Sequence, residues 1–71
     1  MITYSEFRQY SPMLDAEVAR ISVCDERGSE YFMLVPDIGW GKRYREQLQA
    51  TLEQICNAMD RGAEPGEVKP Q

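Results

Sequence analysis

The sequence predicts an α+β fold with the element order α-β-β-α: a short N-terminal helix, an antiparallel β-hairpin and one long amphipathic helix, followed by a disordered C-terminal tail. Three observations predict it. A helix-capping pattern occupies the first residues, two β-type segments flank a glycine-containing turn within residues 18–36, and apolar residues recur at helical spacing over residues 44–59. The 71 residues are therefore expected to form one small domain over 1–62, with 63–71 as the tail.

The N-terminal helix is predicted from residues 3–6, which have the T-x-x-E form of a capping box. Three apolar residues at helical spacing follow it: Phe7, Tyr10 and Leu14. Pro12 interrupts this pattern and could itself begin a second helical turn. The alternative is an extended strand through Ile2, Tyr4 and Arg8, which the poor alternation of apolar and polar residues disfavours.

The hairpin is predicted from two segments, residues 20–24 and residues 30–35, joined by the turn at 25–29 that contains Gly28. The first segment alternates, so one of its faces is apolar and the other is polar. Its apolar face carries Ala19, Ile21 and Val23.

The second strand of the hairpin is apolar on both faces. Phe32 and Leu34 point one way, whereas the other face carries Tyr31, Met33 and Val35. A strand of this kind needs cover on both faces, and one helix covers only one. We therefore expect the second face to be covered by the N-terminal helix or by a second copy of the chain.

The long helix is predicted from apolar residues at steps of four, four, three and four: Tyr44, Leu48, Leu52, Ile55 and Met59. Gly62 follows the stripe and is placed to end the helix. The tail at 63–71 contains two prolines, a glycine and almost no apolar residues, which is typical of disorder.

Composition excludes most catalytic chemistry. The chain has no histidine, and its two cysteines, Cys24 and Cys56, are too few for a zinc site. We therefore predict that the protein is not an enzyme and needs no cofactor or metal. The first residues lack the features of a secretory signal, and two cysteines do not make a disulfide framework, so both thiols are expected to be reduced in a cytoplasmic protein without a membrane span.

The loop before the long helix concentrates positive charge in an acidic chain of net charge −4. It combines Gly39 and Gly41 with aromatic and basic side chains: Trp40, Lys42, Arg43, Tyr44 and Arg45. Glycines, bases and a helix start can bind an anion, and aromatic residues among bases can stack on single-stranded nucleic acid. The competing interpretation is structural, with Trp40 closing one end of the core.

These observations predict a small protein–protein interaction module that binds a protein partner and forms a homodimer. Small size, acidity and the lack of catalytic groups are similar to those of accessory proteins of bacteria and their phages, including inhibitors that act by occupying a partner's surface. Binding of nucleic acid or a phosphate ligand at the loop is the alternative. The predicted interaction residues are Tyr31, Met33, Val35, Trp40, Lys42, Arg43, Tyr44 and Arg45.

Overall fold

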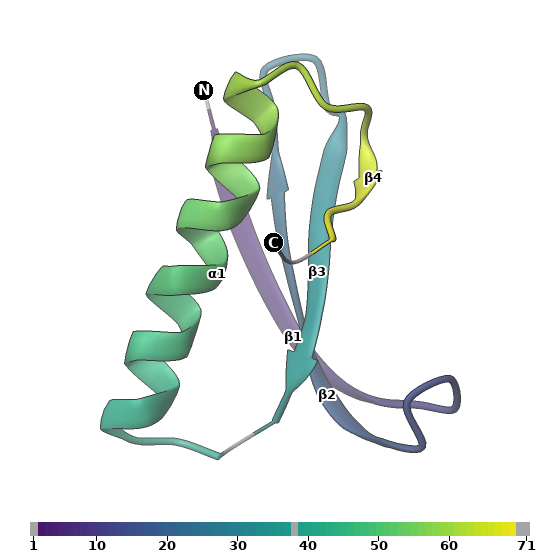
Figure 1. The fold of residues 1–71 in the computed structure, drawn as a ribbon, viewed down its shortest axis with the longest axis vertical. Helices are drawn as coiled ribbons and strands as arrows, with labels where there is room; N and C mark the ends of the chain where they lie inside the picture. The colour runs from purple at the N-terminus through teal and green to yellow at the C-terminus, as the bar shows by residue number, and fades with distance from the viewer. Residues whose placement is uncertain (1, 38, 70–71) are drawn as a thin grey trace.

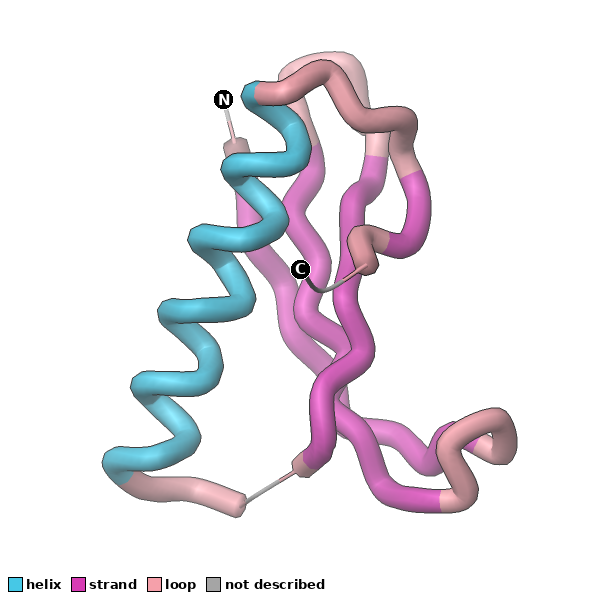
Figure 2. Tube along the Cα trace, in the orientation of Figure 1, coloured by secondary structure: helices cyan, strands magenta, loops and turns pink. Residues whose placement is uncertain are grey.

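The protein has a four-stranded sheet with one helix lying across one face, as the computed structural model of residues 2–37 and 39–69 shows (Figure 1). Its elements in chain order are β1 (Thr3–Ser11), β2 (Ala16–Cys24), β3 (Glu30–Pro36), α1 (Lys42–Asp60) and β4 (Gly66–Glu67). The strands lie in the order β1-β2-β3-β4; the first three are antiparallel, and β4 runs parallel to β3. Figure 2, in which the helix is cyan and the strands are magenta, shows the helix as a layer of its own beside the sheet.

The predicted N-terminal helix is wrong, because residues Thr3–Ser11 form strand β1. This strand pairs with β2 along its whole length, from Thr3 opposite Cys24 to Ser11 opposite Ala16. The Glu6 carboxylate does not cap a helix. It accepts a hydrogen bond of 3.0 Å from the Tyr4 hydroxyl, two residues away on the same face of the strand. Hydrogen bonds to β2 from alternate residues of β1 replace the local bonds that a helix start would have made.

The predicted hairpin is confirmed as β2 and β3. In its turn, Gly28 adopts a φ of 82°, which costs glycine little because it has no Cβ. The Asp25 carboxylate accepts hydrogen bonds of 2.9 Å from the backbone N–H groups of Arg27 and Ser29. Turn chemistry that the sequence displays locally therefore determines this part of the fold.

The long helix is also confirmed, and its apolar stripe packs on the sheet. Ile55 and Ala58 are buried, and Leu48, Leu52 and Met59 pack partly buried beside them. The sheet contributes the residues assigned from strand alternation to one face of each hairpin strand: Ala19, Ile21, Val23, Tyr31, Met33 and Val35. At the helix end, Gly62 donates to Met59 and Ala63 donates to Ala58, both at 3.0 Å, which is the Schellman arrangement.

The opposite face of β3 is covered differently from what was expected. Phe32 and Leu34 are half-buried, but no second layer lies over them among the described residues, because β1 extends the sheet sideways. The guanidinium of Arg20 lies 4.2 Å from the centre of the Phe32 ring and also pairs with Glu30. Arg20 therefore shields Phe32, whereas Leu34 lines an open pocket of about 250 Å³ together with Met13 and Leu14.

The predicted disorder of the tail is wrong for residues 66–68. Gly66 and Glu67 pair with Tyr31 and Phe32, and the N–H of Val68 donates to the Phe32 carbonyl at 2.7 Å. Val68 is 8% exposed and joins the core. Backbone pairing with β3 and burial of Val68 hold this segment against the sheet.

Among the described residues, no helix combines the length and the apolar character that crossing a membrane requires.

Candidate interaction site

Strand β1 forms one edge of the sheet, with β2 on one side and no strand of the described chain on the other. It spans nine residues, whereas β4 at the opposite edge spans two. An edge strand presents a row of unpaired N–H and C=O groups, and proteins commonly protect long edges with lysine or proline. Residues 3–11 contain neither, but Glu6 and Arg8 place charges on the face of the sheet that bears α1, which is another form of edge protection. The outer backbone edge of β1 is unpaired among the described strands.

Exposed apolar side chains gather on β1 and the turn that follows it. Seven large hydrophobic side chains of the described chain are exposed, and all but Trp40 lie in residues 2–14: Ile2, Tyr4, Phe7, Tyr10, Met13 and Leu14. Phe7, half of whose surface is exposed, sits near the middle of β1 on the face away from α1, opposite Arg20. Single exposed hydrophobic residues are ordinary on a protein surface, but here they concentrate in one segment, on both faces of β1 and in the turn that follows it.

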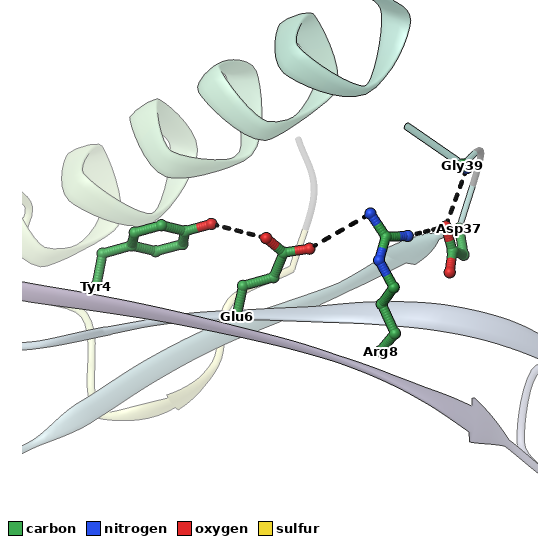
Figure 3. Close-up of polar contacts among 5 residues, drawn as sticks. All are labelled: Tyr4, Glu6, Arg8, Asp37 and Gly39. Atoms are coloured by element: carbon green, nitrogen blue, oxygen red, sulfur yellow. Dashed lines mark hydrogen bonds and ion pairs between the residues drawn. The ribbon is translucent and has the colours of Figure 1, made fainter. Parts of the chain in front are cut away.

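Arg8 links β1 to the loop before α1 (Figure 3). Its guanidinium pairs with the Asp37 carboxylate and lies 3.7 Å from a Glu6 carboxylate oxygen. Asp37 in turn accepts a hydrogen bond of 3.0 Å from the N–H of Gly39, and its own N–H donates to the Glu17 carbonyl at 3.2 Å. Arg8 and Asp37 therefore fix the position of β1 relative to the loop.

Two aromatic rings pack on the same guanidinium. The Arg8 carbon Cζ lies 4.0 Å from the centre of the Trp40 ring and 4.6 Å from that of Tyr44. The two rings are 4.8 Å apart and tilted by 57°. Arg8 thus holds the start of α1 against β1 through cation–π contacts as well as an ion pair.

Charge and burial shift the pKa values of this cluster. The hydrogen bond from Arg8 lowers the pKa of Asp37, and the N–H of Gly39 adds to the effect. Burial raises the pKa of the Tyr44 hydroxyl, and the neighbouring Glu6 carboxylate raises it further. Burial and the hydrogen bond to Glu6 likewise raise the pKa of Tyr4. The cluster therefore favours ionised Asp37 and neutral tyrosines at neutral pH.

A pocket adjoins this cluster. A cavity of about 270 Å³ lies between β1 and the loop, lined by Arg8, Gln9, Tyr10, Glu17 and Asp37. Its Arg8 and Asp37 groups are already paired with each other. Within residues 2–37 and 39–69, no three metal-ligating side chains are close enough to share an ion.

Three of the predicted interaction residues lie in the core. Tyr31, Met33 and Val35 are buried beneath α1, so they are not on the surface of the folded chain. The face of β3 that remains accessible carries Phe32 and Leu34 instead.

The other predicted residues lie at the loop and helix start. Trp40 is 78% exposed, so the interpretation of it as a residue closing the core is wrong. Lys42, Arg43 and Arg45 are exposed as well, whereas Tyr44 is buried under Trp40 and beside Arg8. Among the residues that the structure describes, no side chain caps the start of α1 at Gly41.

Sequence reasoning missed the residues of β1. Phe7 and Tyr10 were predicted to lie on a helix, and Tyr4 and Arg8 were named together only in the strand alternative. Residues 4–10 carry no local signal for a strand, because Glu6 and Arg8 share a face with Tyr4 and Tyr10 and interrupt the alternation of apolar and polar residues.

Comparisons with protein-family models, curated proteins and solved structures found no match to the chain.

The lowered pKa of Asp37 predicts acid sensitivity. A carboxylate whose pKa is lower in the folded than in the unfolded state contributes stability above its unfolded pKa, near 4, and this contribution is lost as the pH falls toward the folded pKa. When the pH is lowered from about 6 to about 3, we expect the melting temperature of the native chain to fall more steeply than that of Asp37→Asn. Circular dichroism melts across this range measure both slopes.

The control for the acid dependence is Glu53→Gln, which removes an exposed carboxylate on α1. It should keep the native slope. An Asp37→Asn variant with the native slope would contradict the assigned role of the Arg8–Asp37 pair.

Proposed function

We propose that this chain is a non-catalytic protein–protein interaction module that binds by adding a partner strand to the edge of β1. The observation that carries the proposal is the long, unpaired edge of β1 with its exposed apolar residues. Strand addition obtains affinity from main-chain hydrogen bonds and specificity from alternate side chains. Strand β1 supplies both, with Phe7 on one face and Tyr4 and Tyr10 on the other.

Phe7→Glu tests the proposal. Within the chain the new carboxylate lies opposite Arg20, so the fold tolerates it, whereas a partner packed against Phe7 loses an apolar contact. A tagged chain is co-expressed with an untagged copy, and the proteins retained with it are compared. At least one protein should be retained specifically by the native chain, and the untagged copy counts as such a protein. We expect Phe7→Glu to reduce the retained amount of that protein by about tenfold or more.

The matched control is Gln49→Glu, which adds the same charge at an exposed position on α1. It should retain what the native chain retains. The proposal fails if the native chain retains nothing, or if Phe7→Glu, shown to be folded by circular dichroism, retains the same proteins.

A second candidate function is the binding of single-stranded nucleic acid or a phosphate ligand at the loop and helix start. The exposure of Trp40 beside Lys42, Arg43 and Arg45 favours it, because an accessible indole among bases can stack on a nucleobase. The net charge of −4 opposes it. Titration of an oligonucleotide at low salt should change Trp40 fluorescence, and salt should reverse the change. An unchanged emission would exclude this function.

A further inference from the structure

Strand β1 has a nearly symmetric sequence about Phe7. Residues at equal distances on the two sides of Phe7 are either of similar type or of opposite charge. The pairs are Tyr4 with Tyr10, Glu6 with Arg8, Ser5 with Gln9, and Thr3 with Ser11. Within the chain, β1 pairs with a strand of different sequence, and Phe7 lies opposite Arg20.

Such a sequence is complementary to itself in an antiparallel pair. When two identical strands are related by a two-fold axis that passes through one residue, positions equally far from that residue lie opposite each other and share a face. An axis through Phe7 aligns all of Thr3–Ser11 with its copy. Each Glu6 then faces the Arg8 of the other copy, and the two phenylalanine rings meet at the axis.

An axis through Glu6 or through Arg8 would also keep both helices on one face of the joined sheet, but each gives a less stable strand pair. An axis through Glu6 places two carboxylates opposite each other, and an axis through Arg8 places two guanidinium groups opposite each other. Like charges directly opposite across a strand pair are destabilising. Each of these registers also pairs fewer residues of β1. Strand length and charge therefore select the same register.

We propose that the strand added to β1 is the β1 of a second copy of this chain, joined through a two-fold axis at Phe7 into one continuous sheet. This proposal rests on the proposed function of β1 as a binding edge. Both helices lie on the same face of the joined sheet. Helix α1 packs on β2 and β3, and no described strand pairs with the edge of β1 that faces away from β2. Tyr4 of each copy faces Tyr10 of the other.

Cysteine cross-linking tests the register. The background carries Cys24→Ser and Cys56→Ser, which remove both native thiols. In this background, Phe7→Cys places two thiols at the axis, where opposite Cβ atoms lie about 4.5–5.5 Å apart, close to the span of a disulfide. Mild oxidation should convert most of the Phe7→Cys protein into a covalent dimer on a non-reducing gel.

Two further variants make the test specific, and both replace exposed polar residues. Gln9→Cys lies on the same face as Phe7, but its thiol is four residues from its copy, about 13 Å along the strand, so it should not cross-link with itself. A mixture of Gln9→Cys and Ser5→Cys chains should cross-link, because these positions lie opposite each other. This mixture keeps the test valid if Phe7→Cys fails to fold.

The outcomes separate this inference from the function on which it rests. Self-cross-linking of Gln9→Cys as efficient as that of Phe7→Cys overturns the register. Absence of a cross-link in every sample, with a monomer in sedimentation at the same concentration, overturns the dimer. If, in that case, Phe7→Glu still fails to retain another protein that the native chain retains, β1 remains a binding edge, and that other protein is what binds it.

Discussion

Replacing Ile55 with alanine is expected to lower the free energy of unfolding by about 3–4 kcal/mol. Ile55 is 0% exposed and lies in the cluster formed by α1 and the sheet, together with Ile21 and Met33. Truncation removes buried methyl groups and leaves a cavity that a close-packed core fills only partly. A domain of this size has a total stability of roughly 4–10 kcal/mol, so the variant loses a large share of it. Urea denaturation followed by circular dichroism measures the difference.

Two variants calibrate the Ile55→Ala result. Ile55→Val keeps most of the buried volume and should cost about 1 kcal/mol. Gln49→Ala, at an exposed position on the same helix, should change the stability by less than about 0.5 kcal/mol. All three are measured at one protein concentration, because association would add a concentration-dependent term. A loss below about 1 kcal/mol in Ile55→Ala would contradict the packing of α1 on the sheet through this residue.

The elements that could be predicted from the sequence are those whose signals are local. The turn at Asp25–Ser29 carries its glycine and its capping carboxylate within five residues, and the helix displays its apolar stripe directly. The alternation of β2 correctly placed Ile21 on the face that packs against Ile55. In each case the residues that determine the structure are close neighbours along the chain.

Strand β1 was missed because distant residues determine it. Glu6 and Arg8 lie on the face of β1 that α1 covers, so charged residues occupy positions where alternation leads one to expect apolar ones. They are accommodated there because Arg8 pairs with Asp37, 29 positions further along the chain, and stacks on Trp40. The local capping pattern and the spacing of Phe7 and Tyr10 therefore favoured a helix that pairing with β2 overrides.

The interaction residues were misplaced for a related reason. Tyr31, Met33 and Val35 were selected because a strand apolar on both faces seemed to need a partner. The side chain of Arg20 shields the other face of that strand by lying on Phe32. The aliphatic part of an arginine and its planar head can cover an aromatic ring while the charge remains in contact with water. The pattern of apolar residues in the sequence does not reveal that an arginine side chain covers an aromatic ring.

The second large effect is expected for a chain that ends at Pro65. Removing the residues beyond it deletes β4 and Val68, which is 8% exposed and packs in the core. Loss of the buried valine and of its backbone hydrogen bond to Phe32 should lower the free energy of unfolding by about 2–3 kcal/mol. The predicted disordered tail would instead be removable at no cost. Urea denaturation of the two chains distinguishes these expectations.

Point substitutions separate the contribution of Val68 from that of chain length. Val68→Ala should lose about 1 kcal/mol through its smaller buried surface, whereas Lys69→Ala, at an exposed position, should remain within about 0.5 kcal/mol of the native chain. The shortened chain also uncovers the backbone edge of β3 at Tyr31 and Phe32, which β4 occupies in the native protein. An uncovered edge next to apolar side chains favours intermolecular pairing, so light scattering should show concentration-dependent aggregation in the shortened chain and not in Val68→Ala. Equal scattering from both would mean that β4 stabilises the core without protecting the edge.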